Sequence, residues 1–191
     1  MRWLLVLLMG CGEEGDGMFP SSSGDVVLSE DYDGLIADSS WTYRDLQNGE
    51  GDTGGLDEDA LLQARYLGDG IVEFRQGSRW ADAVVVGSLE WKSRAGLNLA
   101  SWDFGGNIQG KGTFPLTDET PEAGESVSQD GWSCETLKPE LYDTWYGSFE
   151  DVYSFECSGA GPSGVYVFAR DIGLIALQMD AGLEFDLVAP W

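Results

Sequence analysis

A repeated pattern of short apolar segments, separated by turns that contain glycine, constrains the fold of this chain more than any other feature. The last segment alternates strictly, with Leu183, Phe185 and Leu187 on one face and Glu184 and Asp186 on the other. This period of two is typical of a β-strand with one buried face. The strand candidates cover residues 39–44, 61–66, 71–75, 81–91, 97–104, 110–116, 125–137, 152–157, 165–170, 174–179 and 183–188.

The connections between these segments are short and contain glycine, as at 67–70, 171–173 and 180–182. Such connections are typical of hairpins. No segment keeps a helical period over three turns, and residues 56–65 form the only candidate for a short helix. The pattern therefore predicts an all-β, antiparallel domain over residues 39–191.

The first residues of the chain indicate where the protein is located. Arg2 precedes an apolar run that is far shorter than the roughly 20 residues of a membrane-spanning helix. A charged start and a short apolar core are typical of a secretory signal. The motif LMGC at residues 8–11 resembles the lipobox of bacterial lipoproteins, which implies cleavage after residue 10 and acylation of Cys11. The alternative is a cytosolic protein with an incidental cysteine.

Residues 12–24 are rich in glycine, serine and acidic residues and contain few apolar ones. A segment of this composition cannot bury enough apolar surface to fold by itself. We therefore expect a signal peptide over 1–10, a flexible acidic tether over 11–38 and the β domain after it.

The charge of the chain excludes several classes of function. Ten basic and 34 acidic residues give a net charge of −24, which argues against nucleic acid as a partner. It also argues against docking on anionic lipid, so the acyl chains are the expected membrane contact. Six basic residues fall in one block, either as a local anion site or on outward strand positions; they are Arg65, Arg75, Arg79, Lys92, Arg94 and Lys111.

The catalytic motifs of the common enzyme classes are missing from the sequence. The chain has no histidine, which removes His-based triads, Cys–His dyads and His-rich zinc sites. It also has no G-x-S-x-G, S-x-x-K or C-x-x-C motif. We therefore predict no enzymatic activity and no cofactor, with a hydrolase that uses acidic residues as the alternative.

Two stretches near the C-terminus resemble uncharacterised bacterial envelope lipoproteins. They are TWYGSFEDV at residues 144–152 and GVYVFARDIGLI at 164–175. The resemblance implies a single curved antiparallel sheet or half-barrel in the periplasm, and it supplies no catalytic residues. A β-sandwich is the alternative architecture. The implied location is the bacterial cell envelope, at the outer membrane facing the periplasm or the surface.

Two cysteines remain after Cys11, and an exported protein with such a pair is expected to form one disulfide. Both Cys134 and Cys157 lie in strand candidates, so a bridge between neighbouring strands is geometrically reasonable. A pair of free, reactive thiols is the alternative.

The chain contains eight tryptophans, many for one domain, and most are expected to fill the core. A more specific hypothesis for the tryptophans is a cleft for a small apolar or glycan ligand, lined by Trp91, Trp102 and Trp145. Acidic clusters at 30–33, 57–59 and 118–119 offer oxygen ligands for calcium but lack EF-hand spacing, so no metal site is predicted and a calcium-binding module is a further alternative. The sequence thus predicts a lipid-anchored envelope protein with a non-enzymatic binding or structural role, its ligand held in the concave sheet.

Overall fold

The computed structural model describes residues 39–46, 61–92 and 96–190. The predicted signal peptide, the tether and Cys11 lie outside these ranges, as does Arg94. The described part contains fourteen strands and no helix. They are β1 (Ser40–Asp45), β2 (Leu61–Gly68), β3 (Ile71–Gln76), β4 (Val84–Lys92), β5 (Asn98–Asp103), β6 (Gln109–Pro115), β7 (Ser126–Gln129), β8 (Trp132–Leu137), β9 (Tyr142–Asp143), β10 (Ser148–Phe149), β11 (Val152–Gly159), β12 (Gly164–Ala169), β13 (Gly173–Met179) and β14 (Leu183–Pro190).

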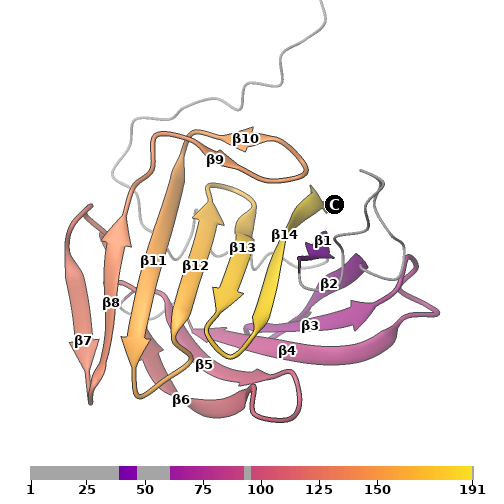
Figure 1. Cartoon of the computed structure of the whole chain (residues 1–191), viewed down its shortest axis with the longest axis horizontal. Helices are drawn as coiled ribbons and strands as arrows, with labels where there is room; N and C mark the ends of the chain where they lie inside the picture. The colour runs from indigo at the N-terminus through magenta and orange to yellow at the C-terminus, as the bar shows by residue number, and fades with distance from the viewer. Residues whose placement is uncertain (1–38, 47–60, 93–95, 191) are drawn as a thin grey trace, which may run out of the picture.

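Twelve of these strands form one antiparallel sheet in the order β6-β5-β4-β3-β2-β1-β14-β13-β12-β11-β8-β7. Figure 1 shows that this sheet curves until its two ends approach each other, which makes it nearly closed and barrel-shaped. Strands β9 and β10 pair only with each other and form a separate hairpin beside the top ends of β11–β13. The predicted all-β, curved antiparallel sheet is therefore confirmed.

Two details of the sequence prediction are wrong. The helix predicted over 56–65 is not formed by residues 61–65, which belong to β2. There Leu62 and Ala64 are buried and alternate with more exposed neighbours. Residues 56–60 lie outside the described ranges. The single strand expected over 125–137 is two strands, β7 and β8. Asp130 and Gly131 between them both have positive φ (51° and 83°), the conformation of a type I′ hairpin turn.

Aromatic side chains fill the interior of the barrel-shaped sheet. Trp91 of β4 reaches the opposite wall and packs edge-on against Tyr166 and Phe168 of β12, with ring centroids 6.3 and 5.5 Å apart. Phe185 of β14 lies 5.3 Å from Phe74 of β3. These rings belong to one continuous core that extends across the sheet. Contacts between opposite walls mean that the concave side is a packed core.

Two inward side chains supply hydrogen bonds where neighbouring strands separate. The pairing of β13 with β14 begins at Ala176. Before that point, Trp41 Nε1 donates to the carbonyl of Ile172 at 2.8 Å, and the Tyr43 hydroxyl donates to that of Leu174 at 2.7 Å. Buried carbonyl groups need such partners. Burial also raises the pKa of Tyr43 well above its usual range, so its hydroxyl keeps the proton that it donates.

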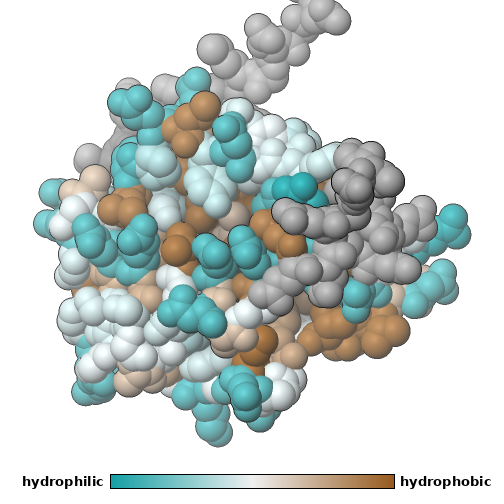
Figure 2. All heavy atoms as spheres, in the orientation of Figure 1, coloured by the Kyte–Doolittle hydropathy of each residue, from teal (hydrophilic) through white to brown (hydrophobic). Residues whose placement is uncertain are grey.

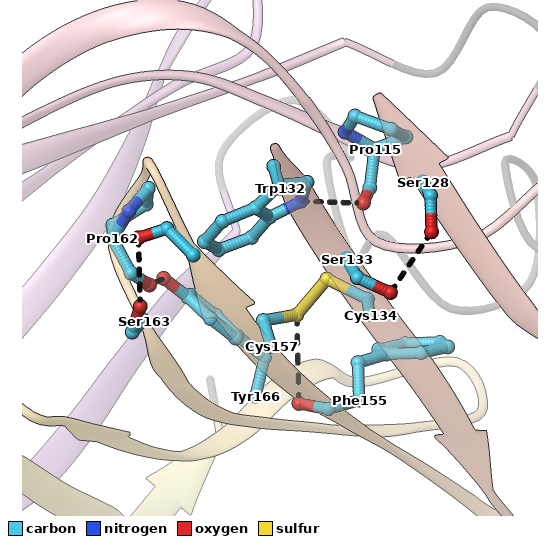
Figure 3. The surroundings of a disulfide bond; sticks show 11 residues. Pro115, Ser128, Trp132, Ser133, Cys134, Phe155, Cys157, Pro162, Ser163 and Tyr166 are labelled. Atoms are coloured by element: carbon cyan, nitrogen blue, oxygen red, sulfur yellow. Dashed lines mark hydrogen bonds between the residues drawn. A yellow bond between two sulfur atoms is a disulfide. The ribbon is translucent and has the colours of Figure 1, made fainter. Parts of the chain in front are cut away.

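The two edges of the sheet, β6 and β7, meet at a seam closed by side chains near one end. The Trp132 indole of β8 donates to the carbonyl of Pro115 at 2.9 Å (Figure 3). The Phe114 ring lies 5.3 Å from that indole. Next to this contact, Cys134 and Cys157 occupy directly opposed positions on β8 and β11 and form the predicted disulfide, with Cα atoms 4.0 Å apart. The disulfide is therefore confirmed, and it fixes the strand that carries Trp132.

Replacing both cysteines, Cys134→Ser with Cys157→Ser, is expected to destabilise the domain by about 3 kcal/mol. The reason is that a bridge over 23 residues removes chain entropy from the unfolded state. Urea unfolding with and without reductant measures this effect. The wild-type midpoint should fall with reductant and the variant midpoint should not. Two titratable free thiols in oxidised wild-type protein would contradict the assignment.

Candidate functional site: a hairpin clamped to the outer face

A partly buried ion pair lies on the outer face of the sheet, where solvent-exposed charges were expected. Asp186 alternates with Phe185 and Leu187, so its side chain points outward, yet it is only 7% exposed. Arg44 is its direct neighbour on β1. The guanidinium donates from Nε to Oδ1 and from Nη2 to Oδ2, both at 2.9 Å. This two-pronged geometry is the strong form of a salt bridge.

The same carboxylate holds the β9–β10 hairpin. The backbone N–H of Trp145, in the turn of the hairpin, donates to Asp186 Oδ2 at 3.1 Å. The next N–H, of Tyr146, donates to the carbonyl of Leu187 at 3.0 Å. The Arg44 guanidinium also lies over the Trp145 ring, 4.9 Å from its centroid, a cation–π geometry. We call Arg44, Asp186 and Trp145 the clamp, because they join β1, β14 and the hairpin.

The hairpin covers an apolar area on the outer face of β12 and β13. Because Tyr166 points inward to Trp91, its neighbours Val165 and Val167 point outward, and Val167 is paired with Ala176. Val167 and Ala176 are nevertheless buried. With Tyr142 of β9 they line a small cavity of about 60 Å³ between hairpin and sheet. Apolar packing therefore continues from the core to the outer face of the sheet, beneath the hairpin.

Tyr142 sits in an environment that disfavours a negative charge. Partial burial and then the neighbouring carboxylates of Asp186 and Glu184 raise the pKa of its hydroxyl. The ring therefore stays neutral over the physiological pH range. Its ring contributes an apolar surface, with the hydroxyl as a polar end, to the side of the hairpin that faces the sheet.

The outward side of the same segment exposes large hydrophobic side chains. Leu141, Trp145 and Tyr146 are 52%, 43% and 47% exposed. They are three of the seven large hydrophobic residues that are exposed in the described part of the chain. The clamp thus presents the aromatic tip, Trp145 and Tyr146, to solvent in a fixed position, and Leu141 lies at the start of the same hairpin.

The three tryptophans predicted to line one cleft occupy three different environments. Trp91 is buried inside the sheet against Tyr166 and Phe168. Trp102 is partly buried on β5 and packs edge-on against Phe114 near the seam, at 5.2 Å. Trp145 lies outside the sheet, at the tip of the hairpin. They do not share a cleft, because the strand alternation directs the first two inward while the third belongs to a surface turn.

The described residues contain no group of three or more His, Cys, Asp or Glu side chains that could hold a metal ion. Of the acidic clusters weighed for calcium, 30–33 and 57–59 lie outside the described ranges. Asp118 and Glu119 are exposed, and Asp118 Oδ1 accepts the backbone N–H of Thr120 at 3.2 Å. That contact is a local loop interaction.

Another hollow, an open groove of about 370 Å³, lies on the outer face of β8, β11 and β12. The carboxylates of Glu135 and Glu156 occupy directly opposed strand positions there, and both residues are exposed. Serines 126, 133 and 158 also line the groove, with Asp180 at its border.

Sequence reasoning placed Asp186 on the outward face but missed the clamp and the role of Tyr142. The partners of Asp186 lie 142 and 41 residues away along the chain, so no local pattern connects them. The sequence feature that could have indicated the hairpin was the pair of aromatic residues Trp145 and Tyr146, which lie within a turn rather than a strand.

Comparison with known proteins provides no relative: no family model, curated protein or solved structure matches this chain. Across residues 39–46, 61–92 and 96–190, no helix has the length and apolar character needed to cross a membrane.

Replacing Asp186 by Asn is expected to destabilise the protein by about 2 kcal/mol, since a largely buried guanidinium loses its charged acceptor. It should also speed amide hydrogen exchange at Trp145 and Tyr146. Urea unfolding and exchange mass spectrometry measure the two effects. Glu150→Gln is the matched control, because it removes the same charge from an exposed residue that follows β10. Equal effects of the two substitutions would contradict the clamp.

Proposed function

We propose that this protein is a non-enzymatic, lipid-anchored protein of the bacterial cell envelope, and that its β domain binds a partner protein through the tip of the β9–β10 hairpin. The observation that carries the proposal is the exposure of Leu141, Trp145 and Tyr146 on a segment held by a partly buried ion pair. Exposed hydrophobic residues gathered on one element are a common mark of an interaction surface.

The composition and rigidity of the tip favour a protein partner. Tryptophan and tyrosine are enriched among the residues that contribute most to protein–protein binding. Binding is weakened when a flexible loop must first be ordered. Here the Trp145 and Tyr146 amides are already bound to β14, so this ordering cost is largely removed.

The charges around the tip indicate the chemistry of the partner. Glu140, Asp143 and Glu150 are exposed along the same segment, and the chain as a whole carries −24. A complementary surface therefore has an apolar centre with basic residues at its rim. A glycan that stacks on the two aromatic rings is the competing ligand class for the same tip.

Binding of an apolar ligand inside the concave sheet has less support. Trp91, Tyr166 and Phe168 already meet across the interior, so a ligand there would have to displace core side chains. For the alternative of an acid-residue hydrolase, the groove at Glu135 and Glu156 is the place to look. Loss of hydrolytic activity in Glu156→Gln, with the hairpin intact, would favour that class.

Attachment to the membrane is proposed through acyl chains on Cys11, on the strength of the lipobox resemblance. Cells that express the protein should incorporate labelled palmitate into it, and Cys11→Ala should abolish the label. Cys134→Ser with Cys157→Ser serves as the control, because it removes two other cysteines. Label retained in Cys11→Ala would contradict the anchor.

Binding through the hairpin is tested by a photo-crosslinking amino acid placed at Leu141 in living cells. We expect one discrete adduct, which should become several-fold weaker when Trp145→Ala and Tyr146→Ala are added. The matched control is the same probe at Leu67, which is 55% exposed but lies in the turn between β2 and β3.

Adducts of equal yield at both positions, or none at Leu141, would contradict a specific site on the hairpin. An adduct that disappears after glycosidase treatment would identify the ligand as a glycan rather than a protein.

A further inference from the structure

The structure gathers part of the basic block around one tryptophan on the outer face of β2 and β3. Arg65 of β2 and Arg75 of β3 both lie over the ring of Trp80, with guanidinium carbons 4.7 and 4.4 Å from its centroid. Arg79 precedes that tryptophan and is exposed. Arg65 and Arg75 thus occupy outward strand positions and also share one aromatic ring, so both interpretations of the basic block fit these two residues.

Free hydrogen-bond donors remain in this cluster. Arg75 donates from Nε to Glu73 at 2.8 Å and from Nη1 to the Trp80 carbonyl at 3.2 Å, which holds its guanidinium in place. Among the described residues, neither Arg65 nor Arg79 forms an ion pair. Lys111 also has no ion pair among the described residues, whereas the remaining described basic residues are paired: Arg44, Arg75, Lys92, Lys138 and Arg170.

Exposed aliphatic side chains begin the strand that is paired with the one carrying Arg75. Val84 and Val85 open β4 opposite Gln76 and Arg75 and are 70% and 54% exposed. Figure 2 shows a hydrophobic patch at the lower right of the molecule, over the start of β4 in Figure 1. We call Arg65, Arg75, Arg79, Trp80, Val84 and Val85 the Trp80 surface.

We propose that the Trp80 surface binds the surface of a phospholipid bilayer, with the arginines on lipid phosphates and the two valines at the border of the acyl region. The planar guanidinium matches the oxygens of a phosphate group. Indole rings favour the membrane interface, and aliphatic side chains gain free energy from burial at that depth. A free anion would use the arginines but would leave the valines exposed.

The net charge of −24 does not oppose this contact strongly. At physiological salt the Debye length is about 8 Å, so distant acidic residues are screened while arginines in contact with phosphate are not. The net charge of the whole chain therefore does not predict how this one face interacts with lipid phosphates.

The position of the Trp80 surface is compatible with the proposed function. It lies at the lower right in Figures 1 and 2, whereas the β9–β10 hairpin lies at the top. A domain that rests on the bilayer by the Trp80 surface would leave the hairpin accessible. The inference does not depend on the identity of the hairpin's partner, and the crosslinking yield at Leu141 reports on that partner separately.

The test uses the full chain with Cys11→Ser, so that no acyl chain contributes, and vesicles of phosphatidylethanolamine with a minority of phosphatidylglycerol. Co-sedimentation should show binding, and Arg65→Gln should weaken it about fivefold, the effect of one basic residue near a membrane surface. Lys111→Gln is the matched control. It removes the same charge from an exposed residue of β6 that has no ion pair among the described residues.

A second variant, Val84→Ser with Val85→Ser, keeps every charge and should also weaken vesicle binding, while circular dichroism confirms that the fold is retained. Inorganic phosphate is the competing probe. Three results would overturn the proposal: no vesicle binding, equal losses in Arg65→Gln and Lys111→Gln, or displacement by phosphate with no effect of the valine substitutions. The last result would assign the site to a free anion.

Discussion

Contact between opposite walls of the sheet is the interaction on which the rest of the structure depends. A sheet of twelve strands that curves almost into a closed shape encloses more space than small side chains fill. Here Trp91 reaches from β4 to Tyr166 and Phe168 on β12, and Phe74 meets Phe185 in the same way. Because the interior is occupied, the surfaces available to partners are on the outside.

Buried polar groups set the remaining details of the architecture. Trp41 and Tyr43 donate to the carbonyls of Ile172, just before β13, and of Leu174 in β13, ahead of the point where β13 pairs with β14, so both carbonyls have a partner. Asp186 has a comparable role on the outer face, where one carboxylate accepts both Arg44 and the hairpin. Side chains thus supply the hydrogen bonds at the places where strands separate or where an extra element is attached.

The outer face carries two surfaces of different chemistry, which suits a protein held at a membrane. The hairpin tip is aromatic with acidic neighbours, whereas the Trp80 surface combines arginines with exposed valines. Both depend on a cation–π contact, of Arg44 with Trp145 in one and of Arg65 and Arg75 with Trp80 in the other. In each case an arginine is held in position by an aromatic ring and a carboxylate rather than left free in solvent.

The sequence by itself determined the class of fold, most of the strands and the disulfide, because alternation and turn residues are local properties and two cysteines allow one pairing. It placed Leu183, Phe185 and Leu187 on the inner face correctly, and Asp186 on the outer one. Only the tertiary structure decided that Asp186 is buried, that Trp91, Trp102 and Trp145 lie apart, and that Arg65 and Arg75 share one ring. These facts depend on which distant strands become neighbours and on what covers each face, and a period of two carries no information about either.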